Sequence, residues 1–121
     1  MTLDQSLDPR WLPVPDAADS LGLEFRRLRN MIREGELVAV RVAGLNGVRI
    51  PSAFLAGPDG NLSIVDGLRG SITQLRDAGM DDDAVVRWLL EPHDELGTSP
   101  ANALAAGQKH AVRRAALVLA F

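Results

Sequence analysis

Four arginines crowded into one short segment are the residues of this sequence best suited to hold a partner. Residues 24–34 contain Arg26, Arg27, Arg29 and Arg33, and carboxylates stand only at the two ends of the segment. A guanidinium is a planar fork of N–H donors that matches phosphate oxygens and the edge of guanine. Exposed helix faces usually mix charge signs, because opposite charges three or four residues apart stabilise a helix. A face of one sign therefore indicates an anionic partner, with an ordinary solvated face as the alternative.

Apolar residues of the same segment predict the element that positions these arginines. Phe25, Leu28 and Ile32 recur at spacings of three and four, which is typical of an amphipathic helix over residues 24–34. We expect these side chains to face inward with Met31 beside them. The opposite face then holds Arg26, Asn30 and Arg33, with Arg27 and Arg29 on its flanks.

The surrounding residues predict a winged helix-turn-helix over residues 12–56. An earlier helix opens at Pro13 and ends at Gly22, so only three or four residues separate the two helices. Strand and turn signals follow Gly35: the β-branched run 37–42, the Asn46-Gly47 turn, the run 48–50 and the strand-stopping Pro51. Two helices at a short glycine turn, followed by a two-stranded wing, make this motif.

The second half of the chain predicts a small helical bundle over residues 66–121. Four amphipathic segments follow one another: 68–77 before Gly79, a helix from Asp81–Asp83 to Pro92, a helix from Ser99 to Gly107, and about 108–121. We expect the bundle to pack on the winged helix-turn-helix, so the fold class is mainly α. Residues 1–11 are polar and broken by proline, which predicts a flexible N-terminal tail.

The distribution of charge reconciles an acidic chain with an anionic partner. The net charge is −3, which by itself opposes binding to nucleic acid. Between Ser20 and Ile50, however, six arginines face three glutamates, so this segment carries +3. Because the field of a charge is screened beyond about 8–10 Å, the local charge decides what a surface attracts.

Composition narrows the compartment and the class of protein. The chain is 46% hydrophobic and 24% charged, as in ordinary globular proteins. It contains no cysteine, which excludes disulfides and thiolate metal sites and favours a reducing cytoplasm. No apolar run reaches 18 residues and the N-terminus does not resemble a signal peptide, so we expect no membrane span. The expected location is the cytoplasm, on the nucleoid when bound to DNA.

Residues that could perform catalysis are sparse. His93 and His110 lie in different surroundings, and neither has a neighbour at metal-ligand spacing. The acids around residues 91–95 could form a dyad, but loop acids are usually only solvated. Phosphate-loop, nucleophile-elbow and zinc-protease motifs are absent. We therefore expect no catalytic residue, no metal and no cofactor, and the chain is not predicted to be an enzyme.

Several sequence signals together resemble a known family. The first half resembles the excisionase and MerR-like winged helix-turn-helix family over about 40 residues, through Ala17-Ala18, the Leu21-Gly22 turn, the Ile32-Arg-Glu-Gly-Glu-Leu37 exit and Ala39-Val-Arg-Val42. The whole chain resembles small actinobacterial DNA-binding proteins that join this motif to a helical domain. Trp88-Leu-Leu-Glu-Pro92 and Leu96-Gly-Thr-Ser-Pro100 are also similar to the toxin-binding domain of Xre/ParS-type antitoxins. Family members usually cap the two helices with Ser or Thr, where this chain has Pro13 and Glu24.

The first functional hypothesis is binding of double-stranded DNA. Helix 24–34 would enter the major groove, where arginine reads guanine and asparagine reads adenine. The candidates for base edges are Arg26, Arg27, Asn30 and Arg29. The candidates for the backbone or the minor groove are Arg33, Arg41, Asn46 and Arg49. Phe25, at a position often polar in relatives, either packs on the edge of the core or touches a thymine methyl group. Regulation of transcription is the expected role.

The second hypothesis is a protein-interaction module, antitoxin-like or scaffolding, whose C-terminal helices hold a protein partner. The acidic start at Asp81–Asp83 and the last helix suggest it, although both could simply build the core.

Thr2 and Ser6 are candidate phosphorylation sites for a Ser/Thr kinase, since added negative charge beside the basic motif would oppose DNA binding. Unchanged affinity of the Thr2→Glu, Ser6→Glu variant would count against that idea. Both a monomer and a homodimer fit the sequence.

Overall fold

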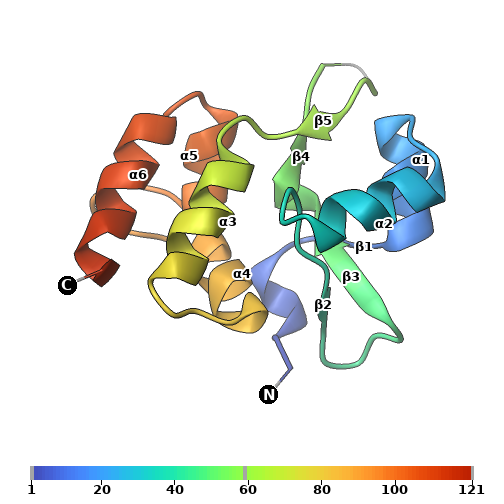
Figure 1. Cartoon of the computed structure of the whole chain (residues 1–121), viewed down its shortest axis with the longest axis horizontal. Coiled ribbons are helices and arrows are strands. Elements are labelled where there is room, and N and C mark those ends of the chain that lie inside the picture. The colour runs from blue at the N-terminus through green and yellow to red at the C-terminus, as the bar shows by residue number, and fades with distance from the viewer. Residues whose placement is uncertain (1, 59, 121) are drawn as a thin grey trace.

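A computed structural model describes residues 2–58 and 60–120 and divides the chain into two halves (Figure 1). The first half contains two helices beside a small sheet, and the second contains four helices. The elements of the first half are β1 (Trp11–Pro13), α1 (Val14–Leu21), α2 (Phe25–Arg33), β2 (Val40–Arg41) and β3 (Val48–Pro51). A two-stranded ribbon, β4 (Leu55–Ala56) and β5 (Ser63–Ile64), leads to α3 (Leu68–Asp77), α4 (Asp82–Leu90), α5 (Pro100–Ala105) and α6 (Lys109–Leu117).

The two helices of the first half form where the sequence predicts them. Proline is present in the first turn of α1, and Gly22 ends that helix in the left-handed conformation with φ 67°. Glu24 and Glu34 flank α2 as its cap residues. Neither helix receives a side-chain hydrogen bond at its N-cap, as the absence of Ser and Thr there predicts. Packing on the core must therefore hold both helices in place.

The sheet has one more strand than the predicted two-stranded wing. Its strand order is β1-β3-β2, and both pairings are antiparallel. β1 is only three residues long and ends in Pro13, which is too short for its alternation to be recognised in the sequence. β2 is shorter than the predicted run 37–42. Leu37 and Val38 precede the residues that pair with β3, and both are buried in the core. Pro51 is the last residue of β3 and pairs with Trp11.

The N-terminal residues are packed, so the predicted flexible tail is wrong for the described part of residues 1–11; Met1 lies outside it. Leu3 is fully buried, and its backbone runs beside the wing, accepting a hydrogen bond from Ala43 N–H at 2.8 Å. The indole N–H of Trp11 donates to the carbonyl of Gln5 at 2.8 Å. A polar segment can be ordered in this way when partners distant in the sequence satisfy its backbone groups.

Asp8 connects this N-terminal segment by hydrogen bonds to Ser52 and Ala53, where the linker between the two halves begins. Its carboxylate is 3% exposed and accepts hydrogen bonds from the backbone N–H groups of Arg10, Ser52 and Ala53 and from the Ser52 hydroxyl. Four donors compensate for burying the charge. A buried acid at this position could not be recognised from the sequence, because Ser52 and Ala53 lie more than 40 residues away.

The four helices of the second half match the predicted bundle closely. α3 has the predicted bounds. Asp81 caps α4 by accepting the N–H of Ala84, and Ser99 caps α5 by accepting the N–H of Asn102. α6 ends at Leu117, and a 3₁₀ turn over residues 118–120 replaces the end of the predicted helix; Phe121 lies outside the described residues.

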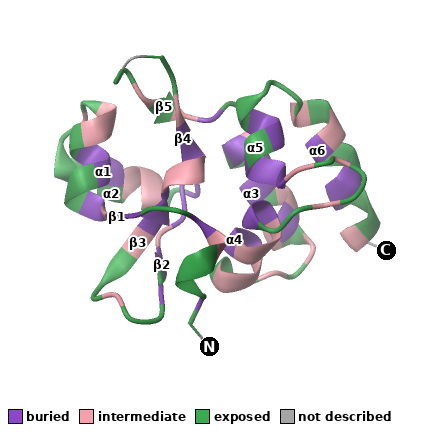
Figure 2. Cartoon of the chain, turned by 180° about the vertical axis from the view of Figure 1, so that it is seen from behind, coloured by how far each residue is buried: buried purple, intermediate pink, exposed green. Residues whose placement is uncertain are grey.

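One continuous hydrophobic core joins the two halves. The buried side chains run from Leu3 to Ala116 as a single cluster, and Figure 2 shows buried segments in both halves. Phe54 is fully buried in the 3₁₀ turn Ser52–Phe54, which packs against α5. α4 in turn contacts β2. The helical bundle therefore supports the sheet that carries the wing.

Replacing Asp8 with alanine should lower the free energy of unfolding by about 3 kcal/mol, measured by urea denaturation, because four donors lose a charged acceptor in a buried place. Asp19→Ala is the matched control, since Asp19 is exposed and its carboxylate has no hydrogen bond among the described residues. Equal stability of the two variants would show that the Asp8 contacts contribute nothing.

Candidate nucleic-acid interface

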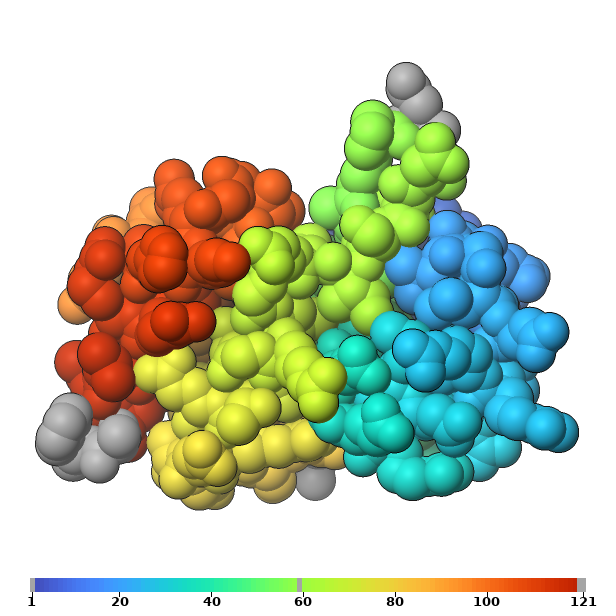
Figure 3. All heavy atoms as spheres, turned by 45° about the horizontal axis from the view of Figure 1, so that its top comes forward, coloured from blue at the N-terminus to red at the C-terminus, as the bar shows by residue number. Residues whose placement is uncertain are grey.

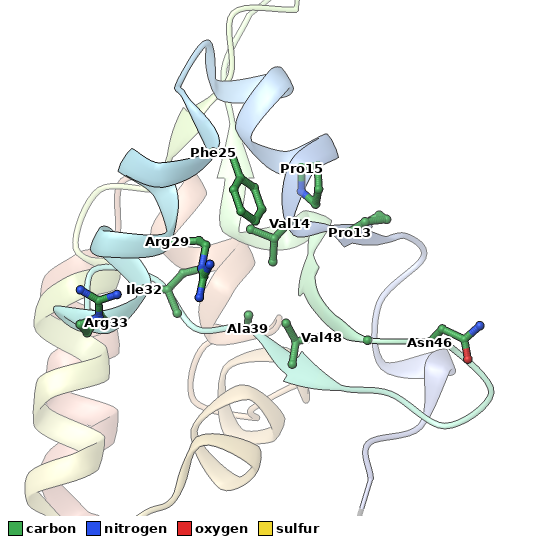
Figure 4. Close-up of a pocket in the computed structure, with 11 residues that line it drawn as sticks. Pro13, Val14, Pro15, Phe25, Arg29, Ile32, Arg33, Ala39, Asn46 and Val48 are labelled. Atoms are coloured by element: carbon green, nitrogen blue, oxygen red, sulfur yellow. The ribbon is translucent and has the colours of Figure 1, made fainter.

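A groove separates α2 from the wing, which consists of β2, β3 and the loop that joins them (Figure 4). It is open to solvent and has a volume of about 640 Å³. Its surface is mostly apolar, with polar groups on both walls. Arg29 and Arg33 line it from α2, and Asn46 lines it from the wing. The apolar lining consists of Pro13, Val14, Pro15, Phe25, Ile32, Ala39, Gly47 and Val48.

The outward face of α2 carries the predicted cationic residues. Leu28 is fully buried and defines the inner side of the helix. At 100° per residue, Arg26, Asn30 and Arg33 point away from it, Arg29 is turned toward the groove and Arg27 lies on the opposite flank. All four arginines are exposed, and Asn30 is half-buried. The structure thus brings the five predicted residues of this helix onto one surface.

Phe25 corrects one prediction. The sequence spacing places it inward, but its side chain is 46% exposed and lines the groove. The guanidinium of Arg29 lies over the ring, and its central carbon is 5.6 Å from the ring centroid. This is within the range of a cation–π contact. Phe25 is the first residue of α2, so the core lies too far behind the helix end for the ring to reach it.

The arginines of this surface have no carboxylate partners in the described part of the chain. The four ion pairs found there involve Arg69, Arg76, Arg87 and Lys109, all of them in the second half. The arginines of α2 and Arg41 of β2 are therefore not engaged by a carboxylate of the described residues. Arg113 and Arg114 of α6 are also absent from these ion pairs, so what sets α2 apart is the number of unpaired arginines on one short helix.

The three predicted wing residues take different positions. Arg41 and Asn46 are exposed. Arg49 is half-buried, and its guanidinium donates to the carbonyl of Asn46 at 3.1 Å and to that of Trp11 at 3.4 Å. Arg49 therefore ties the tip of the wing to β1, and only its remaining N–H groups are available to a ligand. Sequence reasoning identified the charge but not this bracing role.

A second brace on the wing comes from the N-terminal segment. The Gln5 amide donates to the carbonyl of Ala43 at 2.8 Å. Gly44 has φ 82°, a backbone conformation that favours glycine, and a Cβ atom there would lie 2.6 Å from Gln5 Nε2 and displace the Gln5 side chain. The wing is thus held from both of its strands.

The two candidate phosphorylation sites lie in this N-terminal segment, and both side chains are exposed. The backbone N–H of Ser6 donates to Asp4, and this hydrogen bond lowers the pKa of the Asp4 carboxyl below its usual value. No comparison bears on modification of Thr2 or Ser6, which stays a prediction.

Other chemistry has little support in the described residues. No group of three or more His, Asp or Glu side chains in residues 2–58 and 60–120 could hold a metal ion. His93 stacks edge-on against Trp88, with ring centroids 4.6 Å apart. Within the same part of the chain, none of the helices has the length and apolar character needed to cross a bilayer.

The arrangement β1-α1-α2-β2-β3, with an arginine-bearing second helix beside a braced hairpin, defines a winged helix-turn-helix protein. Comparison with family models agrees. Residues 2–55 match the model described as DNA-binding protein Rv2175c, wHTH domain, and residues 65–120 match the Rv2175c C-terminal domain of unknown function. The chain belongs to the Rv2175c family.

Individual relatives support this assignment. The chain is 34% identical to DNA-binding protein Rv2175c of Mycobacterium tuberculosis (strain ATCC 25618 / H37Rv) over 132 residues, which cover 98% of this chain and 87% of that protein. The solved structure described as the NMR structure of Rv2175c has a TM-score of 0.80 at 33% identity, and the match covers 100% of this chain and 89% of that one. The resemblance to an actinobacterial winged helix-turn-helix family is confirmed. The likeness to antitoxin domains stays a prediction.

Arg49→Ala should destabilise the protein by about 1–2 kcal/mol in thermal unfolding, because two backbone carbonyls lose a charged donor. It should also speed hydrogen exchange in the wing. Arg41→Ala removes the same charge from the neighbouring strand, where the side chain is exposed, and should leave stability within about 0.5 kcal/mol. Equal stability and equal hydrogen exchange of the two variants would contradict the bracing role of Arg49.

Proposed function

We propose that this protein binds double-stranded DNA and regulates transcription, with α2 in the major groove and the wing on the backbone. The observation that carries the proposal is the set of unpaired arginines on one face of α2, next to a wing held in place from both sides. The name of the mycobacterial relative supports DNA as the ligand.

The positions of the side chains suggest a division of roles. Arg26 and Asn30 lie at the centre of the outward face, so they are the leading candidates for base edges. Arg27, on one flank, and Arg33, at the C-terminal end of the helix, suit the phosphates of the two strands that border the groove. Arg41 and Asn46 would contact the backbone beside the wing. The backbone contacts supply affinity and the base contacts supply sequence preference.

A regulatory role would require binding at specific sites, which constrains the stoichiometry of the proposed contact. A single helix with a wing reads only a few base pairs, so two copies on neighbouring half-sites would be needed for high specificity. We infer that the protein acts at specific sites in regulatory DNA as a bound pair or as a weakly binding monomer. Selection of bound sequences from a random duplex pool would give both the preferred site and its symmetry, which reports the stoichiometry.

On the selected site, Arg26→Ala and Asn30→Ala should each weaken binding by about 5- to 150-fold in fluorescence anisotropy, because each loses a bidentate base contact. On unrelated duplexes the loss should be much smaller. For the wild-type protein, log affinity should fall with log salt at a slope of about −4 to −5, as expected for some five phosphate contacts.

Arg87→Ala is the control, since Arg87 carries the same charge but is paired with Glu91 on α4. Its binding should equal that of the wild type. The proposal fails if the wild-type protein binds no duplex at low salt, or if Arg26→Ala and Arg87→Ala bind alike.

A protein-interaction role for the second half has one supporting observation. Leu117 and Val118, at the end of α6, are exposed apolar side chains. The surface of two side chains is small compared with that of a stable interface, which buries about 800 Å² per partner. This role is therefore secondary. A Leu117→Lys, Val118→Lys variant that retained every protein partner of the wild-type chain would rule it out.

A further inference from the structure

Phe25 and Arg29 form a unit on α2 that the division of roles above does not use. They are one helical turn apart and lie on the groove side of the exposed face (Figure 4). The guanidinium of Arg29 rests over the Phe25 ring at 5.6 Å. No carboxylate of the described residues competes for Arg29. The pair thus presents an apolar ring and a cation side by side to solvent.

Stacking on a ring leaves the hydrogen-bonding capacity of arginine intact. A guanidinium contacts an aromatic ring through its flat face, whereas its N–H groups point outward in its own plane. Phe25 can therefore orient Arg29 without consuming donors. An arginine oriented in this way pays less conformational entropy when it donates two hydrogen bonds to O6 and N7 of a guanine.

The exposed ring of Phe25 offers apolar surface to a ligand. Phe25 is 46% exposed at the first position of α2, and the first residues of a recognition helix are those that meet base edges. In the major groove only one natural base carries an apolar group, the C5 methyl of thymine. Neighbouring bases on one strand are about 3.4 Å apart. A ring and a cation in contact are thus close enough to touch adjacent base pairs.

We propose that Phe25 and Arg29 together read a thymine beside a guanine: Phe25 packs against the thymine methyl group, and Arg29 binds the guanine edge. This inference rests on the proposed binding of α2 in the major groove and names a two-base element of its site. It also makes Phe25 a determinant of specificity, although it has no hydrogen-bonding group. A 5-methylcytosine carries its methyl group at the same place and satisfies the ring equally well.

The test removes the methyl group from the DNA and leaves the protein unchanged. In the selected site, each thymine next to a guanine is replaced in turn by deoxyuridine, which differs only in lacking the C5 methyl. At one position the wild-type protein should bind about fourfold more weakly, the effect of exposing one methyl group. Cytosine and 5-methylcytosine at that position should differ by a similar factor, with the methylated base preferred.

Variants then assign the effect to the pair. Phe25→Ala should bind thymine and deoxyuridine duplexes alike, and should also lose discrimination at the neighbouring guanine because Arg29 is no longer oriented. Phe25→Leu should retain part of the methyl effect. Val48→Ala is the matched control, because Val48 is another exposed apolar side chain of the groove and should leave the methyl effect unchanged.

The outcomes separate this inference from the proposed function. Equal binding of thymine and deoxyuridine sites by the wild-type protein overturns the role of Phe25 and leaves DNA binding by α2 intact. A selected site with no thymine beside a guanine does the same. Failure of the wild-type protein to bind any duplex overturns both. Because the first measurement needs no variant, an effect of Phe25→Ala on folding cannot obscure the result.

Discussion

The two halves of this chain share one hydrophobic core, and everything that faces the ligand depends on it. A domain of about 60 residues buries only about 60% of the surface that its unfolded chain exposes, and is correspondingly marginal. The DNA-facing half is of this size, and its helices have eight and nine residues. Phe54 is buried where the linker turn meets α5, and β2 lies against α4. The helical half therefore completes the core under the sheet.

The composition of α2 shows why this support is needed. Arg26, Arg29 and Arg33 lie at spacings of three and four, and each such repulsive pair costs roughly 0.2–0.5 kcal/mol. The helix also lacks a side-chain N-cap, which would be worth about 1 kcal/mol. Full burial of Leu28 contributes about 1.5–3 kcal/mol, enough to offset both. By contrast, α4 and α5 of the second half are capped by Asp81 and Ser99.

The sequence predicted what local chemistry determines. Glycine and proline mark the ends of α1, and an aspartate and a serine mark the starts of α4 and α5, because these residues act within one helical turn. The arginines of α2 were found from their common sign. What stayed hidden depends on distant residues: the strand β1 exists only because β3 pairs with it, and Asp8 looks like an ordinary tail residue until Ser52 meets it.

The interface shows the same contrast between features set by local chemistry and features set by distant residues. Hydrogen-bonding residue types were recognised, since their chemistry is visible in the sequence. The bracing of the wing by Gln5 and Arg49 was not, because it runs to backbone carbonyls that a sequence does not place. The spacing of Phe25 predicts an inward side chain, with contact to a base methyl group as the alternative, because helical periodicity describes only the direction of a side chain. At the end of a short helix the core no longer extends far enough to cover it.

Charge placement explains how an acidic chain can present a cationic surface. Several acids of the second half have structural partners: Asp81 caps a helix, Asp82 pairs with Arg76 and Asp66 pairs with Lys109. Their charges are compensated locally, and screening limits their reach to about 8–10 Å. The arginines of α2 have no carboxylate within 4.0 Å in the described part of the chain, and only Glu24 and Glu34 flank them on the helix. A polyanion would therefore be attracted to one face of the molecule, and the acidic remainder would favour encounters in which that face leads.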